Sequence, residues 1–261
     1  MTDQQIDASV PHSARIWNYW LGGDDNHPVD RAAGDAYTAV FPGIVTIARG
    51  SRAFLRRTIE YLVTEVGVRQ FLDVGTGLPT AQNTHQVAQA LAPESRIVYV
   101  DNDPLVLAHA RTLLDSTPRG ATAFVDADLF DTGRILAAAA RTLDLTRPTA
   151  LILSGILGHV ADHDRARSLV TALMDGLPAG SYLSVNEGSR GTDPAYEAAQ
   201  DAYNETGAVP YFLRPVEQIT AFFDGLELVE PGVVPVPLWH PDPTDPAPRP
   251  IGQHGGLARK P

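Results

Sequence analysis

Cysteine is absent from this sequence of 261 residues. Without cysteine the chain can form neither a disulfide framework nor a thiolate zinc site, so an apolar core has to hold the fold together. The hydrophobic content of 44% supplies such a core for one enzyme-sized unit. A chain without disulfides suits a reducing compartment, and we expect the protein to be cytoplasmic.

Long apolar segments are missing as well. The longest nearly apolar run covers residues 150–160, whereas a helix that spans a bilayer needs roughly 20 such residues. The first ten residues, MTDQQIDASV, are polar and acidic and lack the charged and then apolar pattern of an export signal. We therefore expect no membrane partner.

Basic residues are few compared with acidic ones. The 20 Lys and Arg residues against 31 Asp and Glu residues give a formal net charge of −11. A protein that holds nucleic acid through its phosphates needs an extended basic surface. The charge therefore argues against a nucleic-acid partner. The sequence carries no signal for an oligomeric state.

The sequence does contain a strand followed by a glycine turn, in the stretch QFLDVGTGLPT at residues 70–80. Its apolar first half predicts a short buried strand. In the turn, Gly75, Thr76 and Gly77 let the backbone approach a ligand without obstruction by a Cβ atom. Pro79 suits the first turn of a helix, which we expect to run to residue 91. Strand, turn and helix together predict a ligand cradle.

Asp73 helps to identify the ligand of this cradle. A dinucleotide pyrophosphate is an anion, and a carboxylate two residues before Gly75 would repel it. S-adenosylmethionine instead carries an ammonium and a sulfonium, which are cations. The dinucleotide fingerprint G-x-G-x-x-G would also place glycine where this chain has Thr80. The pattern favours S-adenosylmethionine, and a nicotinamide-dependent oxidoreductase is kept as an alternative.

Aspartates also follow the next two expected strands. Asp101 and Asn102 follow the second strand, where a carboxylate can accept hydrogen bonds from ribose hydroxyls. Asp128 follows the third strand and can accept from an adenine amino group, with Leu129 and Phe130 as apolar cover for the ring. Each aspartate alone could simply cap a loop or helix. Three of them at successive strand ends, behind a glycine turn, favour a nucleoside site.

The N-terminal segment brings aromatic and polar side chains together. Ser13 can cap a helix, and the Gly22-Gly23 pair can end it. Its aromatic residues could serve only to attach the helix to the core. Alternatively, the segment folds over the cofactor as a lid, with Arg15, Asn18 and Tyr19 as candidate contacts.

A second helical pattern, over residues 44–66, carries an arginine stripe. Arg49, Arg52 and Arg56 fall on one face of it. Such a stripe is usually a solvated surface, and the alternative is a role in holding an acidic acceptor or the lid.

The fourth expected strand, at residues 150–153, leads into Ser154, Gly155 and then His159. Open α/β sheets bind ligands at the carboxyl ends of their strands, so we expect the substrate to meet the cofactor there. His159 is the candidate general base, and the alternative is a histidine that only packs the loop. His163 lies four residues further on, but no third ligand with zinc spacing is present, so we expect no metal site.

Aromatic residues are also frequent after the fifth expected strand. Tyr196, Tyr203, Tyr211 and Phe212 lie in or near an expected helical insertion. They predict either the lining of an apolar acceptor pocket or part of the core.

Several of these segments together resemble class I S-adenosylmethionine-dependent methyltransferases. The relevant segments are DVGTGLPT, the following NTHQVA helix, VYVDNDP and DADLFD. The chain is most similar to a bacterial family of uncharacterised methyltransferase-like proteins, from ARIWNYWLGGDDN at residues 14–26 to GLARKP at residues 256–261. Many members have two histidines where this chain has Gly158 and His159.

The resemblance implies an α/β, Rossmann-like class I methyltransferase fold. We expect a seven-stranded, mostly parallel sheet with an antiparallel last strand, helices on both faces and an N-terminal helical cap. Residues 1–68 would form the cap or lid, and residues 69–261 the S-adenosylmethionine-binding domain. One expected strand covers residues 226–234.

The resemblance also implies methyl transfer from S-adenosylmethionine. The Asn-Pro-Pro-Tyr type of motif that amino-directed nucleic-acid methyltransferases carry is absent, so we expect an unidentified small-molecule acceptor. A protein that binds S-adenosylmethionine without catalysis is the alternative. The expected cofactor contacts are Arg15, Asn18, Tyr19, Asp73, Gly75, Thr76, Gly77, Asp101, Asn102, Asp128, Leu129, Ser154 and Gly155.

Overall fold

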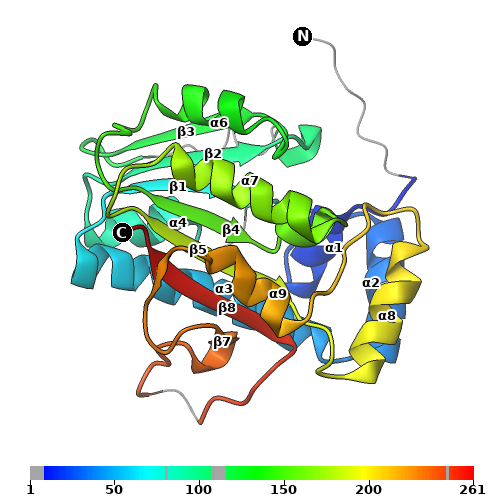
Figure 1. Ribbon diagram of the computed structural model, residues 1–261. Helices are drawn as coiled ribbons and strands as arrows, with labels where there is room; N and C mark the ends of the chain where they lie inside the picture. The colour runs from blue at the N-terminus through cyan, green and yellow to red at the C-terminus, as the bar shows by residue number, and fades with distance from the viewer. Residues whose placement is uncertain (1–8, 80–81, 107, 109–115, 245–246) are drawn as a thin grey trace.

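A central sheet of eight strands organises the computed structural model, which describes residues 9–79, 82–106, 108, 116–244 and 247–261 (Figure 1). The strand order is β3-β2-β1-β4-β5-β8-β6, and β7 also pairs with β8. The strands are β1 (Gln70–Val74), β2 (Arg96–Asp101), β3 (Ala121–Asp126), β4 (Ala150–Ser154), β5 (Tyr182–Gly188), β6 (Glu227–Leu228), β7 (Val234–Pro235) and β8 (Gln253–Arg259).

Strands β1 to β5 are parallel, and β8 runs antiparallel to β5. The strand order reverses direction between β1 and β4, which is the switch point where open α/β sheets bind ligands. All five residues of β1 are buried, as expected for a strand covered on both faces. The expected Rossmann-like architecture with an antiparallel last strand is confirmed.

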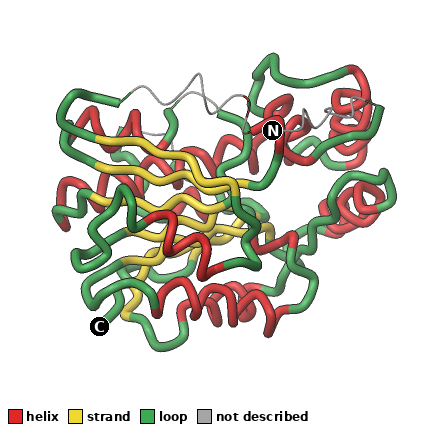
Figure 2. Tube along the Cα trace, turned by 90° about the horizontal axis from the view of Figure 1, so that it is seen from above, coloured by secondary structure: helices red, strands yellow, loops and turns green. Residues whose placement is uncertain are grey.

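Helices cover both faces of the sheet. The helices are α1 (Ser13–Trp20), α2 (Pro28–Val40), α3 (Ile44–Tyr61), α4 (Thr84–Leu91), α6 (Thr132–Ala139), α7 (His163–Asp175), α8 (Pro194–Asn204) and α9 (Val216–Thr220). One face packs against α6, α7 and the turn after α9, and the other face packs against α3 and α4. Figure 2 shows the two helical layers on either side of the strands.

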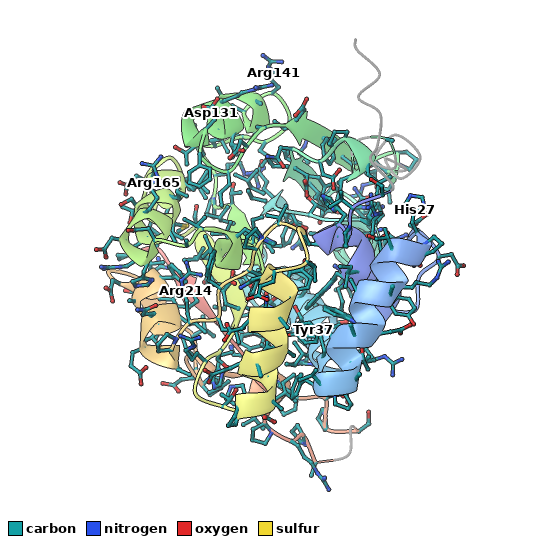
Figure 3. The ribbon with its side chains drawn as sticks, turned by 90° about the vertical axis from the view of Figure 1, so that its right-hand side faces the viewer. His27, Tyr37, Asp131, Arg141, Arg165 and Arg214 are labelled. Carbon is teal, nitrogen blue, oxygen red and sulfur yellow. The ribbon has the colours of Figure 1, made fainter. Side chains whose placement is uncertain are left out.

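A third apolar cluster joins α1, α2 and α8 beside the sheet. In this cluster the Tyr37 hydroxyl of α2 donates a 3.1 Å hydrogen bond to Oε1 of Gln200 on α8. Figure 3 shows Tyr37 between these two helices. Helix α3 contributes Ile44, Ile47 and Ala48 to this cluster, and its later residues pack against the sheet. The boundary after residue 68 stays a prediction.

Two expected helix starts differ from the structure. His12, not Ser13, caps α1, because its Nδ1 accepts from the Ala14 N–H. Helix α4 begins at Thr84 and not near Pro79, because a capping box between Asn83 and Gln86 sets its start. Thr80 lies outside the described residues.

The strand expected at residues 226–234 is interrupted. It consists of β6 and β7, two residues each. Pro231 has no N–H to donate to the neighbouring strand, and Gly232 adopts a φ of +84°. Because one expected strand is present as two, the last strand of the chain is the eighth, β8, and not the seventh.

Within the described part of the chain, no helix is both long enough and apolar enough to cross a membrane.

Candidate functional site

A cavity of about 550 Å³ opens at the carboxyl ends of β1, β2, β3 and β4, between α1, α3 and α8. This volume is typical of a pocket for a small ligand. Twelve of the residues expected at the site line it: Asn18, Asp73, Gly75, Thr76, Gly77, Asp101, Asn102, Asp128, Leu129, Ser154, Gly155 and His159.

The glycine turn forms the floor of the cavity. Gly75 and Gly77 adopt φ angles of +75° and +63°, a conformation that glycine takes without a Cβ penalty. A Cβ on Gly75 would collide with the side chain of Ile156, whereas nothing lies within 4 Å of the place that a Cβ of Gly77 would take. The Gly75 N–H donates to Val100 O over 2.8 Å, which ties the turn to β2. The turn thus presents open backbone to the cavity.

Asp101, at the end of β2, holds this turn in place. Its Oδ2 accepts from the Gly77 N–H at 2.9 Å, and its Oδ1 accepts from the Asp103 N–H at 3.0 Å. Burial raises the pKa of the Asp101 carboxyl. Each carboxylate oxygen has a second lone pair, so Asp101 keeps acceptor capacity toward the cavity.

Asp73, the carboxylate before the turn, is buried. Its Oδ2 accepts a 2.6 Å hydrogen bond from the Thr84 hydroxyl. Burial raises the pKa of Asp73 to about 6, although the Thr84 bond and the nearby Arg52 guanidinium act in the opposite direction. Burial also lowers the pKa of Arg52, which donates from Nη2 to Gln82 O at 3.1 Å.

Arg52 belongs to the arginine stripe of α3, and the structure separates its three members. Arg52 lines the cavity, Arg56 pairs with Glu60 at 2.7 Å, and Arg49 is exposed. The sequence could not select Arg52 among them, because all three share one helical face.

The cavity extends from the glycine turn to the end of β3. Asn102 donates from Nδ2 to Oδ2 of Asp128 at 2.9 Å, which joins the ends of β2 and β3. Leu129 and Phe130 also line the cavity. The Phe130 ring is half-exposed, with the Arg165 guanidinium 5.4 Å from its centroid.

Two of the residues expected at the site do not line the cavity. Arg15 forms a buried ion pair of 2.7 Å with Asp30, and Tyr19 donates to Asp35 at the surface over 2.7 Å. The pattern of the N-terminal segment identified the correct helix. It did not show which of its faces points inward, because that depends on how α1 packs against α2.

His12 makes the contact between this segment and the cofactor end of the cavity. Its Nε2 lies 3.1 Å from Oδ2 of Asp103, in the loop after β2. Its Nδ1 accepts from the Ala14 N–H, so the proton of the neutral ring is on Nε2. Among the described residues Oδ2 of Asp103 has no hydrogen-bond partner, so the contact with His12 is one of proximity. The sequence analysis missed His12, although it directly precedes the helix.

His159 lies in a short 3₁₀ turn after β4 and lines the cavity. Its Nδ1 is 2.8 Å from Pro210 O, which can only accept, so Nδ1 carries the proton and Nε2 stays an acceptor. Burial lowers the pKa of His159, so the ring is neutral at pH 7. The Tyr211 ring meets it edge-on, with the centroids 5.3 Å apart.

Glu187, at the end of β5, holds the His159 turn from behind. Its two carboxylate oxygens accept from the N–H groups of Leu157 and Gly158 at 2.9 and 3.0 Å. Oε2 also accepts from the Tyr211 hydroxyl at 2.6 Å. Burial raises the pKa of Glu187 to about 7, against the effects of Tyr211 and Arg214. The sequence analysis missed Glu187, and its acidic side chain at the end of an expected strand was the signal that could have identified it.

The tyrosines after β5 form the other wall of the cavity. Tyr196 and Tyr203 lie on one face of α8 together with Gln200, at positions i, i+4 and i+7, and all three line the cavity. Tyr211 lines it as well, whereas Phe212 does not. Tyr196 and Tyr203 also belong to the third apolar cluster, so they are part of the core as well as of the cavity lining. That this cavity holds the acceptor stays a prediction.

Among the described residues, no group of three His, Cys, Asp or Glu side chains is arranged to hold a metal ion.

Comparisons with known proteins agree with this geometry. The family model described as S-adenosyl methyltransferase matches residues 1–261. A DUF574 family protein from Streptomyces avermitilis MA-4680 is 45% identical over 98% of this chain and 100% of its own, with a TM-score of 0.92. A Thermobifida fusca YX protein assigned as a methyltransferase is 39% identical over 97% of this chain and 96% of its own, with a TM-score of 0.89.

More distant structures share only the fold. The plantazolicin methyltransferase BpumL, solved with SAH, is 10% identical over 95% of this chain and 96% of its own, with a TM-score of 0.53. No match to the sequence was found among curated proteins. The family match confirms S-adenosylmethionine, rather than a nicotinamide, as the cofactor. This chain belongs to the S-adenosyl methyltransferase family and is an S-adenosylmethionine-dependent methyltransferase.

Proposed function

We propose that the cavity binds S-adenosylmethionine at the ends of β1, β2 and β3 and that the methyl group passes to a small molecule held beside α8. The distribution of charge supports this division. All four carboxylates among the cavity-lining residues, Asp73, Asp101, Asp103 and Asp128, lie in the half formed by these three strands. We call this part the cofactor half. The part lined by the β4 loop, α1 and α8 is the acceptor half.

The residues of the cofactor half fit the cofactor in chemical type. The buried carboxylate of Asp73 suits the ammonium group, and Arg52 beside it suits the methionine carboxylate. Asp101 suits the ribose hydroxyls, since each of its oxygens keeps a free lone pair. Asp128 and Leu129 suit the adenine end.

The chemistry asks for positioning more than for reactive side chains. When bound, S-adenosylmethionine supplies a methyl group that is already activated by the sulfonium. The protein then has to hold the acceptor in line and exclude water. For a hydroxyl acceptor, Nε2 of His159 is the group that takes the proton. We propose His159 as the general base.

Helix α1 serves as the lid in this proposal. The 3.1 Å contact between His12 and Asp103 attaches the start of α1 to the loop that carries the ribose and adenine contacts. Asn18 of α1 lines the cavity between its two halves. In this role residues 1–68 act as the cap of the cofactor domain.

The assignment of the cofactor half is tested by calorimetric titration of S-adenosylhomocysteine into the wild-type protein and the Asp101→Asn variant. The amide retains an oxygen for the Gly77 N–H and loses the charge, so we expect affinity to fall at least about tenfold. Asp126→Asn is the matched control, because Asp126 pairs with Asp101 in register but is exposed and does not line the cavity. Equal affinities of both variants and the wild type would remove Asp101 from the site.

A further inference from the structure

Three polar side chains that line the cavity have no hydrogen-bond partner among the described residues. They are the Tyr196 and Tyr203 hydroxyls and the Gln253 amide. The three residues are buried, with 3%, 7% and 2% of their surface exposed. Polar side chains of residues this buried are usually hydrogen-bonded within the protein. These three open into the cavity instead, so the arrangement indicates a ligand that forms hydrogen bonds with them.

These groups lie along one wall of the acceptor half. A Cβ on Gly188 would meet Tyr196 Oη at 2.6 Å and Tyr211 Cε1 at 3.2 Å, so both tyrosines converge over this residue. Gly188 is also the register partner of Gln253 across β5 and β8. Tyr203 follows two helical turns along α8, about 10 Å further along the axis. The wall thus offers hydrogen bonds at separated points.

The hydroxyls of this wall are neutral donors and acceptors. Burial raises the pKa of both Tyr196 and Tyr203, so neither ionises near neutral pH. Within the described part of the chain, no carboxylate lines the acceptor half. A phenol group of a ligand can donate to such a wall or accept from it, whereas an ionised ligand would meet only uncharged partners there.

Flat aromatic side chains enclose the same space. Trp17 and Trp20 of α1 meet at 70° with ring centroids 5.9 Å apart, and both line the cavity. On the side of the β4 loop, Tyr211 lies edge-on to His159. Aromatic surfaces of this kind favour planar ligands through offset and edge-to-face contacts.

We propose that the acceptor is a neutral, planar aromatic molecule with at least two hydroxyl groups. One hydroxyl binds a hydrogen-bonding group of the wall formed by Tyr196, Tyr203 and Gln253, and another is methylated beside His159. This inference rests on the proposed function. The acceptor oxygen forms the new O–C bond, its proton goes to Nε2 of His159, and the electron pair of the broken S–C bond stays on the sulfur of S-adenosylmethionine.

The test uses three probes of similar size with the protein saturated with S-adenosylhomocysteine. The probes are 2,6-dihydroxynaphthalene, naphthalene and 2-naphthoate, and tryptophan fluorescence reports binding through Trp17 and Trp20. We expect the diol to bind at least about tenfold more tightly than either other probe, since a site built for hydroxyls discriminates against ligands that lack them. Equal or tighter binding of naphthalene or 2-naphthoate would overturn the proposal.

Two conservative variants, Tyr196→Phe and Tyr203→Phe, connect that preference to the wall. Each removes a hydroxyl without a partner and keeps the ring. We expect the variant that lacks the hydroxyl bound by the diol to bind the diol about 3- to 10-fold more weakly, and naphthalene to bind both variants as it binds the wild type. Tyr182→Phe is the control, because Tyr182 lies on β5 outside the cavity. If both variants bind the diol as the wild type does, the wall is not the acceptor site.

Calorimetry with S-adenosylhomocysteine separates this inference from the proposed function. A wild-type protein that binds S-adenosylhomocysteine but shows no preference for the diol contradicts the acceptor class alone. A protein whose S-adenosylhomocysteine affinity is unchanged in Asp101→Asn contradicts the cofactor assignment, whatever the probes do.

Discussion

The Tyr211 hydroxyl donates a 2.6 Å hydrogen bond to Oε2 of Glu187. The same carboxylate accepts the N–H groups of Leu157 and Gly158, in the turn that carries His159. Tyr211, which lines the cavity, is thereby connected through one buried side chain to the turn of the candidate base. The geometry of the site depends on this link between the loop after α8 and the ends of β4 and β5.

Tyr211→Phe should therefore destabilise the protein. The change removes a donor to the buried Glu187 and an acceptor for the Gly188 N–H, which is 2.9 Å from the hydroxyl. We expect a loss of about 1–3 kcal/mol in the free energy of unfolding, measured by urea denaturation. Tyr196→Phe, whose hydroxyl has no partner among the described residues, should change it by less than about 0.5 kcal/mol. Similar losses for both variants would contradict this account.

Gly158→Ala and Gly133→Ala should have effects of opposite sign. A Cβ on Gly158 would collide with the Tyr211 ring, and we expect overpacking to cost about 1–3 kcal/mol of unfolding free energy. Gly133 lies in α6 with open space around the place of its Cβ, so alanine should stabilise there by about 0.5–1 kcal/mol. Thermal unfolding of the two variants measures the difference. Stabilisation by Gly158→Ala would show that the ring moves away at little cost.

Asp73→Asn should raise the free energy of unfolding of the protein without ligand and lower its affinity for S-adenosylhomocysteine. The folded pKa of Asp73 is about 6, above the unfolded value of about 3.9, so the folded state binds the proton more tightly. Stability therefore decreases as pH rises from about 4 to 6, and the cost of the buried carboxylate is fully present above that window. At pH 8 we expect the variant to be about 1–3 kcal/mol more stable than the wild type, and at pH 4 about equal to it.

The same variant should bind S-adenosylhomocysteine at least about tenfold more weakly at pH 8, because its ammonium loses a charged acceptor. For the wild type, affinity should fall as pH decreases through about 6. Unfolding curves at the two pH values and calorimetry measure both effects. A variant that is less stable than the wild type at pH 8 would show that Thr84 and Arg52 stabilise the ionised carboxylate by more than its burial costs.

His159 should titrate below its ordinary pKa of about 6.5, because burial disfavours the imidazolium form. Its Nδ1 donates to Pro210 O, so the neutral ring should be the Nδ1–H tautomer. Both properties can be followed by NMR of labelled imidazole resonances, with His159→Gln to assign the signals. A midpoint at or above 6.5, or the Nε2–H tautomer, would remove His159 as a ready general base at neutral pH.

Local patterns were enough to predict the core of the cofactor half. The glycine turn, Asp73, Asp101 and Asp128 could be placed because parallel strands in a βαβ arrangement bring their carboxyl ends to one edge. Residues that follow those strands then share a cavity regardless of the rest of the chain. Most helix and strand positions could be predicted from the spacing of apolar residues along the chain.

Two elements show where local patterns were insufficient. Pro231 and Gly232 interrupt a run of β-forming residues, and the run became β6 and β7. Arg15 and Tyr19 have side chains suited to a cofactor contact, but Asp30 and Asp35 on α2 bind them instead. The first outcome follows from two residues within the run that end its strand pairing, and the second depends on partners on another helix.

The sequence by itself determined the sheet, its switch point and the acidic end that suits a cationic cofactor, because these follow from hydrophobic period and from residues next to strand ends. Only the tertiary structure decided the acceptor half. Tyr211 is 24 residues from Glu187, and Tyr37 is 163 residues from Gln200. Such contacts form only when α1, α2 and α8 pack beside the sheet, and no local pattern encodes which faces then meet.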